Sequence, residues 1–144
     1  MSRLGLAALM LTASACAGGS PGPVAIEVGR DVCASCRMVI SSPLTAAELL
    51  APGEEPQLFD DLGCLQTALQ AAAPPEGSVI VVADHLTGEW IRIENAVLTE
   101  VPDLQTPMRS GLVAHPTAAD RDRDPAARGG RPYDRAVLLA GGRR

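Results

Sequence analysis

Hydrophobic residues follow two different patterns in the middle of the chain. After the acidic pair at residues 60–61, leucines and alanines recur at helical spacing until two prolines at residues 74–75. The next apolar run, Val79–Ala83, is continuous, which is typical of a strand that is covered on both faces. The pattern therefore predicts a helix followed by a buried strand.

Short apolar segments surround these two elements. The segments that predict further strands are bounded by proline, glycine or charged residues, and they lie at 24–28, 90–93, 96–101 and 112–114. A tight turn is expected at residues 94–95. Residues 31–40 have β-branched ends around a turn with two cysteines, and residues 44–50 fit either a strand or a helical turn.

The end of the chain has a weaker pattern. Thr117 is expected to cap a helix over residues 118–128, which Pro125 shortens or breaks. Residues 132–139 fit either a last strand or a helix, and residues 141–144 read as a tail.

The order of the elements predicts an α+β fold. Strands, a helix and a strand are followed by the same order again, which indicates small sheets that each carry a helix, arranged as two ββαβ-like units. The first unit is expected over residues 31–84 and the second, weaker one over residues 85–140.

The first residues have the pattern of a bacterial lipoprotein signal. Arg3 precedes an apolar run that is too short to span a bilayer, and small residues stand directly before Cys16. Residues 1–15 are therefore expected to be a signal peptide, and residues 16–30 a lipidated tether with a first strand. A plain secretory signal is the alternative. The first interpretation places the protein outside the cytoplasm, lipid-anchored through Cys16 at the periplasmic face of a membrane or at the outer membrane.

Composition excludes several classes of function. The formal net charge is -5, and the chain has one Phe, one Trp and one Tyr, which argues against a nucleic-acid partner. The sequence has neither a glycine-rich phosphate loop nor a serine nucleophile motif. We therefore expect a binding protein and not an enzyme.

The segment Cys33-Ala34-Ser35-Cys36-Arg37-Met38 is the densest group of chemically active residues. Because residues two apart on a strand point to the same face, Cys36 and Met38 can present a thiolate and a thioether side by side. Soft sulfur ligands of this kind favour Cu(I). Cys33 can either join in metal binding or form a disulfide with Cys36.

Two other sulfur-containing residues leave alternatives open, whereas two histidines and two aspartates have an expected role. Met108, in a polar loop with a proline, is either a ligand or a gap-filling core residue. Cys64, at the start of the predicted helix, is either a reactive thiol or a buried core residue. His85 and His115 lack the spacing of a zinc motif, so each is expected to be a surface or hydrogen-bonded residue. Asp60 and Asp61 are expected to cap the helix.

Taken in order, these motifs resemble the NosL family of copper lipoproteins, which accompany nitrous oxide reductase. The likeness extends from about residue 31 to residue 114. The matching residues are Cys36, Met38, Ile40, Phe59, Asp60, Asp61, Cys64, Asp84, Trp90, Ile91, Ala96, Thr106, Pro107, Met108, Gly111 and Ala114. The chain departs from the family pattern at Pro125 and in its arginine-rich end.

The resemblance implies a Cu(I)-binding metallochaperone built from two small ββαβ-like units. Cys36, Met38 and Met108 match the positions that supply copper ligands, with Cys33 and Cys64 as further candidates. The implied partners are apo nitrous oxide reductase, or another cuproenzyme, and a membrane copper-delivery complex. The main alternative is an extracytoplasmic thiol–disulfide oxidoreductase that uses Cys33 and Cys36. A third interpretation is a structural lipoprotein whose thiols are incidental.

Overall fold

The computed structural model describes residues 22–140 of the 144-residue chain. The expected signal peptide at residues 1–15, the lipid attachment point Cys16 and the tail at residues 141–144 lie outside the described residues. Among the described residues, no helix has the length and apolar character that crossing a membrane requires.

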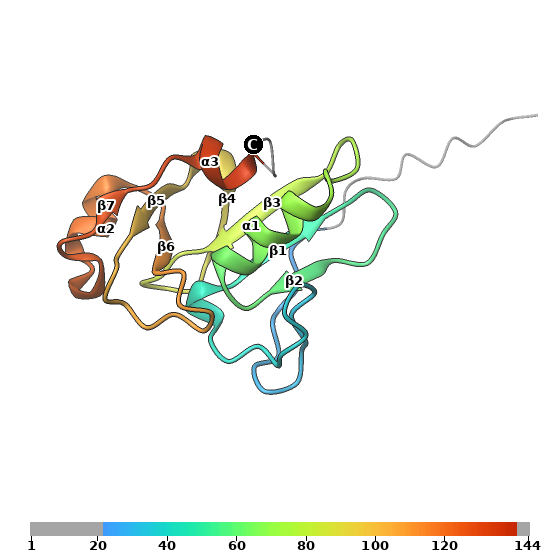
Figure 1. The fold of residues 1–144 in the computed structure, drawn as a ribbon, viewed down its shortest axis with the longest axis horizontal. Helices are drawn as coiled ribbons and strands as arrows, with labels where there is room; N and C mark the ends of the chain where they lie inside the picture. The colour runs from blue at the N-terminus through green and yellow to red at the C-terminus, as the bar shows by residue number, and fades with distance from the viewer. Residues whose placement is uncertain (1–21, 141–144) are drawn as a thin grey trace, which may run out of the picture.

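The first part of the chain forms a four-stranded antiparallel sheet with one helix (Figure 1). Its elements are β1 (Ala47–Leu50), β2 (Gln57–Phe59), α1 (Leu62–Ala71), β3 (Val79–Ala83) and β4 (Trp90–Arg92). The strands lie in the spatial order β2-β1-β3-β4, so β3 is an inner strand, as its apolar sequence predicts. Helix α1 begins at the cap residue Asp61 and buries Leu62, Leu65 and Leu69, which confirms the predicted helix.

The second part repeats this order of elements in a smaller sheet. Its elements are β5 (Val97–Glu100), β6 (Leu112–His115), α2 (Ala118–Arg123), β7 (Arg131–Pro132) and α3 (Arg135–Leu139). The strand order β6-β5-β7 corresponds to β2-β1-β3 in the first sheet, and all pairs are antiparallel. The expected α+β fold of two small ββαβ-like units is therefore confirmed.

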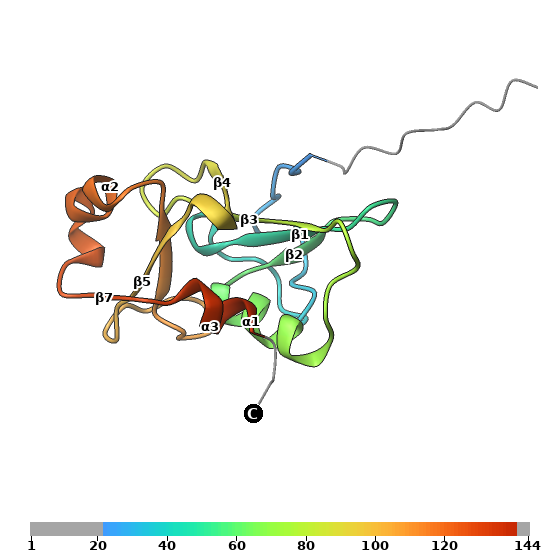
Figure 2. The same cartoon turned by 90° about the horizontal axis from the view of Figure 1, so that it is seen from above.

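Both units contribute to one hydrophobic core. Phe59 and Leu65 from the first unit and Leu98 and Leu112 from the second are buried in the same cluster. Helices α1 and α3 lie side by side (Figure 2), where the Gln66 amide donates to the Tyr133 hydroxyl at 2.8 Å. The two sheets therefore pack as one body around shared apolar side chains.

The described residues also include three short 3-10 helices. They are η1 (Pro43–Thr45), η2 (Ile93–Asn95) and η3 (Pro125–Ala127). The chain turns tightly at residues 94–95, as expected, since the Ala96 N–H donates to the Ile93 carbonyl at 3.3 Å. The strands on either side of this turn do not pair with each other, because β4 pairs with β3 in the first sheet and β5 pairs with β6 in the second. Helix η2 therefore carries the chain from one sheet to the other.

Two segments differ from the prediction. Residues 24–28 are irregular and not a strand, because the Val24 N–H donates to the Glu48 carboxylate at 3.1 Å instead of to a neighbouring strand. Helix α2 begins after Thr117, as expected, but ends at Arg123, and Pro125 starts η3. The ambiguous segment at residues 44–50 contains both η1 and β1, and residues 132–139 contain the end of β7 and all of α3.

Candidate metal centre

Three cysteine side chains from two parts of the chain lie together beside the start of α1. Cys33 and Cys36 belong to the loop that precedes η1, and Cys64 lies in the first turn of α1. Their sulfur atoms lie within 4.8 Å of one another, and all three thiols are free. One metal ion could therefore contact all three sulfur atoms.

Backbone hydrogen bonds hold the loop that carries Cys33 and Cys36. The Cys33 N–H donates to the Met38 carbonyl at 2.8 Å, and the Arg37 N–H donates to the Cys33 carbonyl at 3.0 Å. The Ala34 N–H donates to the Leu58 carbonyl in β2 at 2.7 Å, which fixes the loop to the strand that leads into α1. Cys33 is thereby fully buried near α1, whereas Cys36 remains partly accessible.

The expectation that Cys36 and Met38 share one strand face is wrong. Cys36 lies in a turn, and the next residue, Arg37, has a left-handed backbone with φ 64°. Side chains alternate between two faces only in an extended backbone, so the Cys-x-Met spacing does not by itself bring the two sulfur atoms together. The Met38 side chain is 59% exposed, and it is not among the residues that line the cavity beside Cys36 and Cys64.

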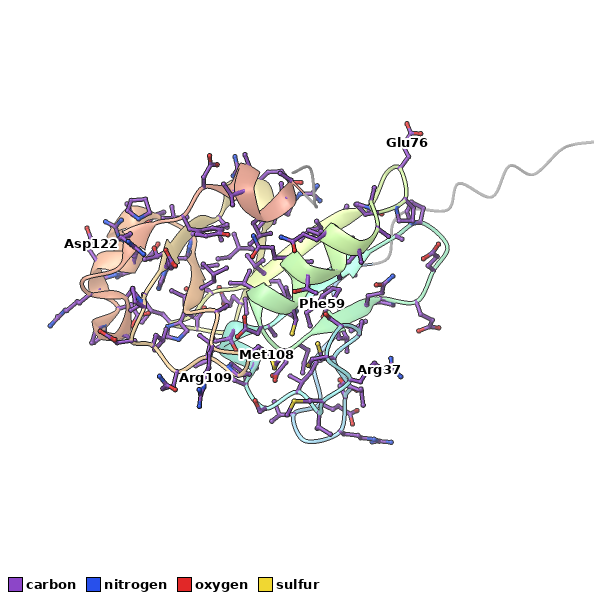
Figure 3. The ribbon with its side chains drawn as sticks, viewed as in Figure 1. Arg37, Phe59, Glu76, Met108, Arg109 and Asp122 are labelled. Carbon is purple, nitrogen blue, oxygen red and sulfur yellow. The ribbon has the colours of Figure 1, made fainter. Side chains whose placement is uncertain are left out.

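Met108 belongs to the second unit, but it lines a cavity together with two of the cysteines. An open cavity of about 360 Å³ is lined by Ser35, Cys36, Gly63, Cys64, Thr67 and Met108. The Met108 side chain is 43% exposed, and Figure 3 marks its position beside the first unit. The loop between β5 and β6 therefore folds back over the start of α1, and Met108 is a rim residue and not a core residue.

Asp61 joins this loop to α1. One of its carboxylate oxygens accepts the Gly63 N–H at 2.7 Å and caps the helix, while the other accepts the Met108 N–H at 2.9 Å. The Asp61 side chain is fully buried. Asp60 has a different role from the helix cap expected for it, because its carboxylate accepts the Ser41 N–H at 2.8 Å. The acidic pair thus holds two loops around the cysteines.

Two glycines permit the close approach of these loops. A Cβ atom at Gly63 would lie 2.8 Å from the Ser110 Cβ, closer than two such atoms can pack. Gly111 has φ +65°, and a Cβ atom there would lie 2.4 Å from the Val101 carbonyl oxygen. A larger side chain at Gly63 would push the Met108 loop away from α1, and one at Gly111 would separate the two ends of that loop, where the Val101 N–H donates to the Gly111 carbonyl.

The surroundings of the thiols favour ionisation of one of them and oppose ionisation of another. Burial raises the pKa of the Cys33 thiol, but the backbone N–H groups of Asp60, Cys36 and Ser35 oppose it, so the pKa of Cys33 lies below its ordinary value. Burial, followed by the neighbouring Cys33 charge, raises the pKa of Cys64 far above its ordinary value. A second thiolate therefore forms readily only when a cation balances its charge.

A second group of metal-ligating side chains was missed by the sequence analysis. His85, His115 and Asp124 offer ligand atoms that lie within 4.8 Å of one another. The three residues are distant in sequence and match no spacing motif, so only the packing of the two sheets brings them together. The parallel bridge between Asp84 and Ala114 places the two histidines at neighbouring positions.

Comparisons of the chain with protein-family models, with curated proteins and with solved structures found no match.

Proposed function

We propose that the protein is a Cu(I) carrier that holds copper between the cysteine loop and the Met108 loop. The observation that supports this most strongly is the convergence of four sulfur-bearing residues on one small region. Cys33, Cys36 and Cys64 cluster within 4.8 Å, and Met108 lines the same open cavity as Cys36 and Cys64. Thiolates and thioethers are soft ligands, which prefer Cu(I) to hard cations.

Cys36 and Met108 are the primary ligands in this proposal. Cys36 is the most accessible of the three thiols, and Met108 lies across the cavity from it on a separate loop. Met38 supplies the third sulfur by a movement of its exposed loop toward Cys36. Cys33 and Cys64 are buried further inside, where they can replace Met38 as ligands.

An accessible site suits transfer better than storage. With two or three sulfur ligands at an open rim, a partner can add its own ligand before the carrier releases the ion. A closed site with four sulfur ligands lacks such a position and would slow this exchange. The protein then acts without catalysing a reaction, and copper is its cargo.

The resemblance to NosL proteins supplies the cellular setting of the proposal. The carrier is anchored to a bacterial membrane through lipidated Cys16, outside the cytoplasm, and receives copper from a membrane copper-delivery complex. Its client is apo nitrous oxide reductase or another extracytoplasmic cuproenzyme. Copper transfer from the loaded carrier to the apoenzyme, followed by gel filtration and metal analysis, tests this client directly; copper that stays with the carrier would contradict it.

A thiol–disulfide oxidoreductase is the competing proposal. Such an enzyme needs an exposed thiol of low pKa as its nucleophile. The thiol whose pKa is lowered here is Cys33, which is fully buried, whereas Cys36 is the accessible one. This division of roles favours metal binding, and it leaves Met108 with a function.

A Cu(I) competition titration under anaerobic conditions tests the assignment of the site. The Cys36→Ser variant should lose at least about tenfold in affinity, which corresponds to about 1.4 kcal/mol. Ser35→Ala is the matched control because Ser35 lines the same cavity without a soft donor, and it should bind like the wild type. Unchanged affinity in Cys36→Ser would refute the assignment.

A further inference from the structure

His85, His115 and Asp124 form a compact hydrogen-bonded group at the junction of the two sheets. One carboxylate oxygen of Asp124 accepts from both rings, at 2.6 Å from His85 Nδ1 and at 3.0 Å from His115 Nε2. The other oxygen accepts the Ala126 N–H at 2.9 Å and caps η3. The carboxylate is therefore fixed, with one oxygen on the Ala126 N–H and the other on the two imidazole rings.

The group is almost fully shielded from solvent. The exposed fraction of the side chain is 0% for His115, 4% for Asp124 and 14% for His85. Burial tends to raise the pKa of Asp124, but hydrogen bonds from His85, Ala126 and His115 outweigh it, so this pKa lies below its ordinary value and the carboxylate is ionised at neutral pH. The group thus offers one negative charge and two imidazoles in a site that water reaches only past His85.

One ring nitrogen of His115 lacks a hydrogen-bond partner among the described residues. The Nε2 atom faces Asp124, but Nδ1 is buried and has no such partner in the described part of the chain. A buried ring nitrogen without a partner is costly, so a hydrogen bond to Asp124 alone does not account well for a histidine here. A metal bond to Nε2 would not give Nδ1 a partner, but its free energy would exceed the cost of that one unpaired atom.

We infer that His85, His115 and Asp124 bind a divalent transition-metal ion of the Zn²⁺ or Cu²⁺ class, at a site separate from the sulfur cluster. Imidazole nitrogen and carboxylate oxygen are the donors that such ions prefer, whereas Cu(I) prefers sulfur. On binding, the ring protons that face Asp124 leave His85 Nδ1 and His115 Nε2, and each neutral ring carries its proton on the other nitrogen. Three protein ligands leave a fourth coordination position, which a water molecule would fill.

The bound ion would join the two units. His85 follows β3 of the first sheet, His115 ends β6 of the second, and Asp124 stands between α2 and η3. The His85 N–H also donates to the Ala114 carbonyl at 2.9 Å, so the backbone at the site already connects the sheets. An ion held by all three side chains binds the folded protein alone and therefore raises its melting temperature.

Cobalt(II) titration of the full chain in detergent, without oxygen, tests the site with a spectroscopic probe. The Cys36→Ser background limits binding at the sulfur cluster, where thiolate-to-cobalt charge transfer would be seen in the near ultraviolet. In this background we expect visible cobalt absorption without that charge-transfer band, removal of the signal by Zn²⁺, and a rise of about 5 °C in melting temperature with Zn²⁺.

Two variants and one control decide the outcome. His85→Ala should weaken cobalt binding at least about tenfold, and Asp124→Asn, which keeps the cap on Ala126, should do the same if His85→Ala folds poorly. Asp122→Asn removes an exposed carboxylate from the adjoining helix α2 and should change nothing (Figure 3). The inference is overturned if the Cys36→Ser chain binds no cobalt, or if the folded His85 or Asp124 variant binds it as well as before. Because Cu(I) affinity is measured separately, this result does not decide the copper proposal.

Discussion

Replacing Met108 with leucine separates a ligand from a packing residue. Leucine has nearly the volume of methionine but no sulfur lone pair, and such exchanges usually cost less than about 1.5 kcal/mol even in a core. Met108 is 43% exposed, and its tie to Asp61 uses the backbone N–H, which leucine keeps. We therefore expect a loss of about 0.5 kcal/mol, or about 2 °C in melting temperature.

Copper binding should respond much more strongly to the same change. The variant loses one of two primary ligands, so its Cu(I) affinity should fall at least about tenfold, or about 1.4 kcal/mol. The assay pairs thermal melting of the metal-free chain with a Cu(I) competition titration. A variant that melts far lower yet keeps its copper affinity would show that Met108 is a packing residue and that the two units do not share a copper site.

Three further predictions concern other parts of the molecule. Asp61→Ala removes the helix cap and the acceptor for Met108, so it should cost about 2 kcal/mol in urea unfolding and also weaken Cu(I) binding, whereas exposed Asp103→Ala should do neither. Burial raises the pKa of Glu48, so the folded protein loses stability as pH rises from about 4.5. Glu48→Gln should therefore be about 1 kcal/mol more stable than the wild type at pH 7 but not at pH 3.5. The exposed control Glu55→Gln should show no such pH-dependent gain. Cys16→Ser should release the protein from the membrane fraction, and a mature N-terminus at any other residue would contradict the lipid anchor.

The elements that local chemistry determines were predicted well. Helix α1 has a capping aspartate at its start, apolar residues at helical spacing and prolines after its end, so each local signal supports the same element. Strand β3 is apolar throughout because it lies between two other strands. The repeated order of elements was also visible in the sequence, because each unit carries its own strand and helix signals.

The contacts that depend on distant residues could not be predicted in the same way. Residues 24–28 have the composition of a strand, but the Val24 N–H donates to the side chain of Glu48, which lies outside any local pattern. Residues 94–95 turn the chain as expected, but no local pattern reveals that β4 pairs with β3, where Trp90 lies opposite Ala83, while β5 pairs in the second sheet. Pairing across sheets is decided by packing and not by the turn residues alone.

The two metal-binding groups show the same limit. The sequence singled out Cys33, Cys36 and Met108 by residue type, but the order of residues does not reveal which sulfur atoms meet. Cys64 lies beside Cys33 because the hydrogen bond from the Ala34 N–H to the Leu58 carbonyl fixes the cysteine loop to the strand before α1. The group of His85, His115 and Asp124 left no local signal, since its members meet only where one sheet contacts the other.

X-ray absorption at the copper edge, on the full chain loaded with one equivalent of Cu(I), tests the central claim most directly. The account predicts a first shell made of two or three sulfur atoms, which loses sulfur in Cys36→Ser and in Met108→Leu. A first shell dominated by nitrogen and oxygen, unchanged in both variants, would contradict it.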